Sequence, residues 1–237
     1  MPEGGGTATQ AGIYYQNSVA ALALADLLDL DRRVAREHIV EVRLEAPGDV
    51  DDVVLRFADG HREFQNVKLS VQLGSSAWAC IWQSFSAQQQ GSDFGADDQL
   101  TLVVAERNAA SEAVLGLCER AGSAVDEAEL RRRLTQAQSN TLDSIVTLLG
   151  SGTAAFELLR RTRVVHLAIE DIEQHLARRR LSGTQSPPPA LLPLLRDMAG
   201  GDARKRGLFQ PGPLRRRLKI EHGILLGYVD KGDSQIV

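Results

Sequence analysis

Two different periods of apolar residues run through the first seventy positions of the chain. Apolar side chains in residues 16–30 recur at helical spacing, whereas residues 39–45 alternate between apolar and polar side chains. Residues 52–57 and 63–69 are also strand-like, and the turn between them contains Asp59-Gly60, a strong short signal for a hairpin. This part of the sequence therefore predicts a helix followed by three strands, of which the last two form a hairpin.

Further along, longer elements alternate with buried strands. A helix is predicted over residues 76–90, and the run LTLVVA at 100–105 is typical of a strand covered on both faces. Residues 111–161 favour three or four helices with a break at 150–152. A second buried strand at 164–169 and a helix at 170–180 follow. The order predicts an α/β fold, a mixed sheet flanked by helices with a helical insertion and a helical C-terminal tail.

Length and composition bound the domain organisation. With 237 residues, 43% hydrophobic and 24% charged, the chain is long enough for one large globular domain. We expect a flexible Gly/Thr-rich tail at residues 1–11 and one domain over 12–185, with the insertion at about 107–162. A Pro-led basic extension is expected over residues 186–237.

The sequence also predicts where the protein resides. The longest apolar run, residues 19–28, is too short to span a bilayer, and the N-terminus has no signal-peptide pattern. The 2 cysteines, Cys80 and Cys118, have no zinc-ligand or CxxC spacing. We therefore expect a reduced, cytoplasmic protein without membrane contact.

Charge is distributed unevenly along the chain. Residues 1–119 contain 8 Lys+Arg and 18 Asp+Glu, a net charge of −10, whereas residues 120–237 contain 19 and 13, a net charge of +6. Such asymmetry is found where a metal site lies beside a phosphate-binding surface, but it also arises from solvated helix ends. The candidate nucleic-acid-binding clusters are Arg131, Arg132 and Arg133; Arg178, Arg179 and Arg180; and Arg215, Arg216 and Arg217.

The predicted hairpin brings chemically useful residues together. Asp51 or Asp52 opens its first strand, and Asn66 and Lys68, two positions apart, share a face of the second. Hard oxygen ligands of this kind hold Mg²⁺ or Mn²⁺, and a nearby lysine stabilises charge on a phosphate. Each residue also has an ordinary structural interpretation: the aspartates as turn residues and Lys68 as an edge-strand lysine.

At these residues the sequence resembles the PD-(D/E)xK nuclease superfamily. More narrowly, it is similar to the double-stranded-DNA endonuclease domains of bacterial antiphage defence, found in cyclic-nucleotide-activated (CBASS-type) effectors and at the N-terminus of STAND NTPases. The resembling features lie in residues 11–110: Gly12-x-x-Tyr15-Gln16, Glu45 before Asp51-Asp52, Asn66-Val67-Lys68-x-Ser70, and a helix containing Gln83 and Gln88.

The resemblance implies a restriction-endonuclease-like fold and a role for each matching residue. Asp52 and Glu45 would hold Mg²⁺ or Mn²⁺, Asn66 would contribute an oxygen or position water, and Lys68 would assist the nucleophile. Asp51, Glu41, Gln16 and Gln88 are secondary candidates, and Asp51 remains an alternative to Asp52. The implied partners are double-stranded DNA, a further copy of the chain, and a sensor, which is an ATPase or a nucleotide-sensing protein or fused domain.

One position departs from the family pattern. The family has Glu, Asp or Gln two residues before the lysine, and this chain has Asn66. Asparagine keeps a carbonyl oxygen but is shorter than glutamate and uncharged. Gln65 does not replace it, because it points to the opposite face of the strand. The alternative function is therefore a degenerate nuclease fold that binds DNA or a partner protein without cleavage.

Overall fold

The computed structural model describes residues 4–29, 35–46, 49–50, 52–177, 188–203 and 205–226. Within them the elements follow in this order: α1 (Gly4–Leu28), β1 (Ile39–Leu44), β2 (Val53–Phe57), β3 (Arg62–Lys68), α2 (Ser76–Gln90), β4 (Gln99–Val104), α3 (Ala109–Ser123), α4 (Glu127–Arg132), α5 (Gln136–Leu149), α6 (Gly152–Arg160), β5 (Thr162–His166), α7 (Ile169–Ala177), α8 (Pro188–Ala203), β6 (Leu208–Phe209) and α9 (Pro211–His222).

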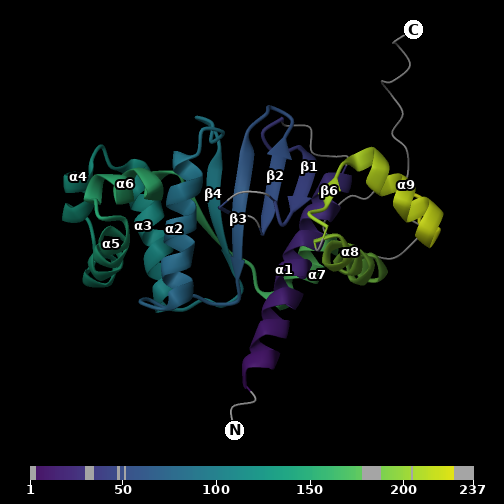
Figure 1. The fold of residues 1–237 in the computed structure, drawn as a ribbon, viewed down its shortest axis with the longest axis horizontal. Helices are drawn as coiled ribbons and strands as arrows, with labels where there is room; N and C mark the ends of the chain where they lie inside the picture. Colours follow the sequence, from purple (N-terminus) through teal and green to yellow (C-terminus); the bar gives the residue numbers. More distant parts are fainter. Residues whose placement is uncertain are drawn as a thin grey trace.

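A mixed 6-stranded sheet in the order β5-β4-β3-β2-β1-β6 forms the centre of the molecule (Figure 1). β2 is antiparallel to both β1 and β3, which confirms the predicted hairpin at Asp59-Gly60. β4 and β5 run parallel to β3. The predicted α/β class with a mixed sheet and flanking helices is therefore confirmed.

Two hydrophobic cores cover the two faces of the sheet. Leu100, Leu102 and Val104 of β4 belong to the core formed with α2 and the helices α3–α6, whereas Val103 faces the core formed with α1, α7 and α8. This alternation follows from the period of two in a strand. It explains why β4 is apolar throughout, because both of its faces are buried.

The first helix begins earlier than the sequence predicts. Residues 4–11, expected to be a flexible tail, continue α1 as helix from Gly4. Glycine disfavours a helix by about 1 kcal/mol relative to alanine, which is why the run Gly4-Gly5-Gly6 indicated a loose segment. Extending an existing helix costs far less than nucleating one, and the buried part of α1 supplies the nucleus.

The insertion consists of short, well-capped helices. Asn108 and Thr135 form capping boxes at the starts of α3 and α5, and Gly150 ends α5 in the left-handed conformation at φ 72°. Among the described residues, no single helix is long and apolar enough to cross a bilayer. α5 and α6 meet that test only as a pair, and they are bent by 111° at their junction.

The C-terminal extension is part of the same folded unit. α8 and α9 pack against α1, and Leu191, Leu195 and Leu218 are buried in the core on that side. Residues 208–209, which lie in the extension expected to be basic and helical, form β6 and pair with Val42 and Arg43 of β1. A strand of two residues has no periodicity, so only its tertiary partner reveals it.

Candidate functional site

Asp52 lies where β2 begins, next to the end of β3. Val53 pairs with Gln65 across the hairpin, so the next position of the ladder sets Asp52 beside Asn66. The Asp52 side chain is 11% exposed, and its Oδ2 accepts a hydrogen bond of 2.7 Å from the backbone N–H of Val67. The backbone of β3 therefore fixes the orientation of this carboxylate.

Lys68 reaches the same carboxylate from the end of β3. Its Nζ lies 3.2 Å from Asp52 Oδ2 and 3.2 Å from the carbonyl oxygen of Val67. One cation is thus held between a carboxylate oxygen and a main-chain oxygen. The lysine side chain is 28% exposed, so solvent reaches the pair.

Helix α1 supplies the third contact to Asp52. Gln16 Nε2 donates a hydrogen bond of 2.9 Å to Asp52 Oδ1. The neighbouring Tyr15 is fully buried and donates from its hydroxyl to the carbonyl of Leu167 at 2.8 Å. Burial also raises the pKa of Tyr15 above its ordinary value, so the hydroxyl stays a donor. This anchor fixes the rotation of α1 and thereby the position of Gln16.

Asn66 is buried on the same face of β3 as Lys68. Phe64, two residues earlier, packs in the α2 core, and strand alternation puts Asn66 and Lys68 on that side. Asn66 is 7% exposed, and its Oδ1 has no hydrogen-bond partner among the described residues. Gln65 faces the other way and donates to Glu63 at 2.8 Å, so it does not take the place of Asn66.

The other acidic candidates differ in their placement. Glu45 follows β1 at φ 47°, and its backbone N–H donates to the carbonyl of Asp52 at 3.4 Å. Glu41 instead forms an ion pair of 3.0 Å with Arg56, which leaves it among the charged side chains of β1 and β2. Asp51 lies outside the described residues. The structure therefore brings Glu45, but not Glu41, next to Asp52.

Gln88 is not brought to this site. β3 and β4 are parallel, so α2, which connects them, runs back from the end of β3 towards its beginning. Gln88 lies in the last turn of α2, roughly 18 Å along the helix from its start near Lys68. Its side chain is buried in the core, and no described residue forms a hydrogen bond with its Oε1.

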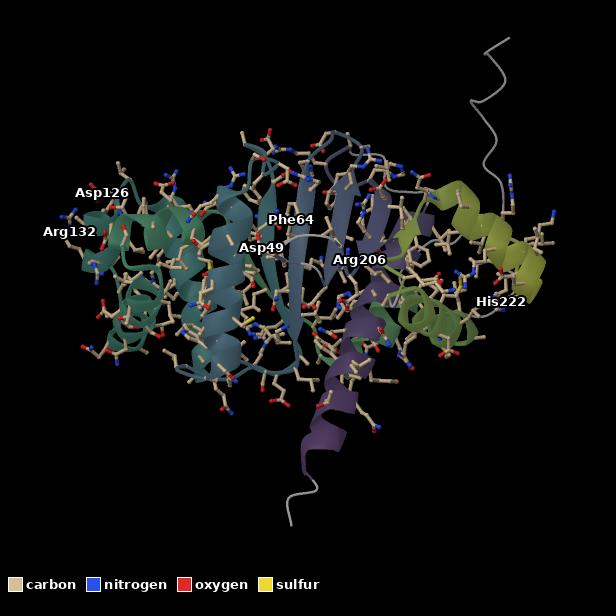
Figure 2. All side chains as sticks on the ribbon, in the orientation of Figure 1. Asp49, Phe64, Asp126, Arg132, Arg206 and His222 are labelled. Atoms are coloured by element: carbon tan, nitrogen blue, oxygen red, sulfur yellow. The ribbon has the colours of Figure 1, made fainter. Side chains whose placement is uncertain are left out.

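Most of the predicted DNA-binding arginines lie away from Asp52 or form ion pairs with neighbouring carboxylates. Arg131 pairs with Glu127 and Asp143 at 2.8 Å each, and Arg133 pairs with Glu129. Arg132, in the same helix, lies at the far end of the molecule from Arg206 (Figure 2). These contacts are the ones expected of charged helix ends.

The two remaining clusters belong to the C-terminal half of the chain. In α9, Arg217 pairs with Asp202 and Glu221, Arg215 donates to the carbonyl of Leu28 at 3.4 Å, and Arg216 is exposed. Arg178, Arg179 and Arg180 lie outside the described residues. Of the described members of the predicted clusters, none lines the surface around Asp52.

A serine and a histidine also meet, on β5 and α3. His166 Nε2 lies 3.0 Å from Ser111 Oγ, and Glu112 lies 3.9 Å from the other ring nitrogen. Ser111 is fully buried and forms the capping box of α3 with Asn108. Burial lowers the pKa of His166, with a smaller opposing effect of Glu112. A nucleophile needs access to its substrate, so this pair has a structural role.

A cleft of about 880 Å³ opens beside Asp52, between the first half of α1 and α8. We call it the α1–α8 cleft. Its polar lining includes Asp52, Glu45 and Gln16 of the site, together with Tyr14, Asn17, Arg196, Asp197 and Arg206. No motif or basic run in the sequence singles out Arg196, which lies about 140 positions from Asp52. Arg206 ends the run Arg204-Lys205-Arg206, one of the basic runs of the C-terminal half that the sequence offers for phosphate contacts.

The oxygen atoms around Asp52 suit a hard divalent cation. Mg²⁺ binds through one or two carboxylates and keeps several waters, so it does not require a cage of acidic residues. Asp52, the unpartnered Oδ1 of Asn66 and the carbonyl of Val67 provide such a set. In the described part of the chain, no three His, Cys, Asp or Glu side chains form a metal-binding group. The residues present therefore fit Mg²⁺ or Mn²⁺ better than zinc.

Comparison with known proteins identifies the fold. No protein-family model and no curated protein matches the sequence. The structure of the Acinetobacter baumannii Cap4 SAVED/CARF-domain containing receptor with the cyclic trinucleotide 3'3'3'-cAAA is similar, with a TM-score of 0.54 and 15% identity over 84% of this chain and 44% of that chain. The structure of the same receptor with 2'3'3'-cAAA has a TM-score of 0.54 and 14% sequence identity, and the match covers 88% of this chain and 45% of that chain. The chain thus spans less than half of these receptors and shares the fold of that part.

Proposed function

We propose that this chain is a metal-dependent endonuclease domain that hydrolyses phosphodiester bonds of double-stranded DNA as an effector of antiphage defence. The observation that carries the proposal is the Asp52–Lys68 pair at the ends of two hairpin strands, whose charged atoms lie 3.2 Å apart and whose aspartate lines the α1–α8 cleft. A carboxylate and a lysine at such strand ends are the arrangement that the sequence resemblance to PD-(D/E)xK nucleases implies.

A metal ion would be held by Asp52, by the carbonyl of Val67 and by Asn66. Bound Mg²⁺ or Mn²⁺ lowers the pKa of a coordinated water and polarises the phosphate. Gln16 and the Val67 N–H hold the Asp52 carboxylate in place through bonds of 2.9 and 2.7 Å. Lys68 orients the attacking water and stabilises negative charge on the phosphate.

The defence role rests on two independent resemblances. The motif residues resemble cyclic-nucleotide-activated nuclease effectors, and the fold resembles part of Cap4 receptors solved with cyclic trinucleotides. Unregulated cleavage of duplex DNA would damage the host, so we expect control by assembly of several copies and by a sensor. We assign the sensing of the signal to a further domain or a separate subunit, and catalysis to the fold described above.

Plasmid cleavage tests this proposal directly. Supercoiled plasmid is incubated with the protein in Mg²⁺, in Mn²⁺ and in EDTA, over a wide range of protein concentrations. Lys68→Ala is expected to reduce cleavage at least about 100-fold, the usual contribution of a proton-transferring or charge-stabilising side chain. Lys219→Ala, which removes an exposed lysine of α9, is the matched control and should cleave normally. Cleavage that persists in Lys68→Ala or in EDTA would contradict the assignment.

A second candidate is a nuclease fold that binds DNA without cleaving it. Asn66 favours it, because asparagine is shorter than the glutamate or glutamine of the family pattern and lacks the charge of its glutamate or aspartate. This candidate predicts DNA binding that EDTA does not change, and no cleavage at any concentration.

In the same preparation, calorimetric titration with a cyclic trinucleotide tests a sensing role. Tight binding would move the function of this fold from effector to sensor.

A further inference from the structure

The α1–α8 cleft contains two arginines that the proposed chemistry does not use. Arg196 lies on α8, and Arg206 lies in the turn between α8 and β6. Neither forms an ion pair with any residue that the structure describes. By contrast, Arg131, Arg133 and Arg217 all pair with carboxylates. Two cations that no described carboxylate pairs with, in a cleft shared with Asp52, point to an anionic ligand.

Arg196 is held in place while its charge remains available. Its guanidinium carbon lies 4.2 Å from the centre of the Tyr14 ring, a cation–π contact between α8 and α1. Its Nε is buried and has no hydrogen-bond partner in the part of the chain that the structure describes. Such an unmade hydrogen bond is uncommon in folded proteins and calls for an explanation. A planar guanidinium presents several donors that match phosphate oxygens, so a phosphate in the cleft would pair with the charge of Arg196.

Arg206 has a strained backbone. Its φ is 54°, and of the described residues other than glycine only Glu45 shares a positive φ. Both residues line the α1–α8 cleft. The turn is locked by hydrogen bonds from the N–H groups of Arg206 and Gly207 to the carbonyls of Ala203 and Asp202. A left-handed conformation costs a non-glycine residue roughly 1–2 kcal/mol, and such strain concentrates at functional sites.

From these observations we infer that the α1–α8 cleft binds the DNA backbone beside the scissile phosphate, with Arg196 and Arg206 each contacting a phosphate. The inference rests on the proposed nuclease function and gives it a substrate path. Asp52 and Glu45 lie on the side of the cleft where metal would bind, and the arginines lie on the α8 side. Asp197 also lines the cleft from α8, and its carboxylate offsets part of the positive charge of the two arginines.

Binding measured without cleavage tests the inference. Affinity for a dye-labelled duplex of about 20 base pairs is measured in EDTA by fluorescence anisotropy, over a series of salt concentrations. Removing one arginine that binds a phosphate should reduce the slope of log K against log[salt] by about 0.9. Arg196→Gln and Arg206→Gly are each expected to show that reduction, and the double variant about twice as much. Glycine is chosen at 206 because it accepts the positive φ.

Arg132→Gln is the matched control. It removes one exposed arginine from α4, at the far end of the molecule, where the sequence placed a DNA-binding cluster. Its slope should equal that of the wild type. Suppose that the wild type binds duplex DNA. If the two cleft variants then keep the wild-type slope, or if the slope of Arg132→Gln falls as much as theirs, the inference is overturned. The proposed nuclease function would still stand. If the wild type binds no duplex DNA at low salt, the proposed function itself fails. Circular dichroism and thermal melting confirm that each variant is folded.

Discussion

At the scale of single residues, Asn66 has the most consequence for the proposed activity. It is buried beside Asp52, and within the described residues its carbonyl oxygen has no hydrogen-bond partner. An unsatisfied buried acceptor costs roughly 1–3 kcal/mol, so its retention needs a compensating role. A cation that binds between Asp52 and Asn66 would satisfy this oxygen, and asparagine avoids the repulsion that a second carboxylate would meet when no metal is bound.

Asn66→Asp tests this role. In EDTA the added carboxylate is buried next to Asp52, so we expect a lower Tm than in the wild type. Saturating Mg²⁺ should reverse the loss, because a ligand at about 100 times its Kd stabilises the folded state by about 2.7 kcal/mol. Melting curves with EDTA and with Mg²⁺ measure both effects. Gln65→Glu, on the opposite face beside Glu63, is the control and should lose stability that Mg²⁺ does not restore.

At the scale of elements, the insertion helices depend on their ends. α5 ends at Gly150, whose φ of 72° is a conformation that glycine adopts without strain and other residues do not. A Cβ added at this position would meet no atom within 4 Å. The effect of a substitution is therefore confined to the backbone. The cap satisfies the carbonyl of Val146 through a hydrogen bond of 2.8 Å.

Gly150→Ala should lower the free energy of unfolding by about 1 kcal/mol, the cost of placing a Cβ in the left-handed region. Gly122→Ala is the matched control, because Gly122 lies inside α3, and a Cβ there also meets nothing within 4 Å. Alanine favours a helix over glycine, so this variant should be as stable as the wild type or more stable. Urea unfolding measures both. Equal effects of the two substitutions would contradict the role of the left-handed cap.

How far the sequence predicts the structure depends on the distance between partners. Asp52, Asn66 and Lys68 belong to one hairpin, whose turn and alternation are local signals, so their proximity could be predicted. The position of Gln88 could not, because the direction of α2 follows from the parallel pairing of β3 with β4. β6 and the arginines of the α1–α8 cleft reach the site only through tertiary packing of α8 against α1. No pattern within residues 188–209 predicts that packing.

At the scale of the whole molecule, one chain has one Asp52–Lys68 site, while a DNA duplex has two strands of opposite direction. A single site hydrolyses one strand at a time, and cutting both strands together requires two copies related by a rotation. The positive net charge of residues 120–237 is spread over several elements, so it does not by itself mark a binding surface.

Plasmid products should therefore change with protein concentration. At low concentration we expect nicked circles, and at high concentration linear DNA, with a rate that rises more steeply than the first power of concentration. Agarose gels of time courses measure this, and light scattering at the same concentrations reports the assembly state. Linear product formed directly at the lowest active concentration, with a monomer in solution, would contradict the requirement for two copies.

The left-handed backbone of Arg206 sets two properties of the protein against each other. Glycine at this position would relieve the strain at φ 54° but would remove the side chain that we assign to DNA. Arg206→Gly should then melt at a higher temperature than the wild type while binding duplex DNA more weakly. Stability and activity often trade against each other at functional sites. A directed-evolution screen for thermostability alone would thus select against this arginine, and a stabilised variant of the protein should be checked for DNA affinity before it is used in its place.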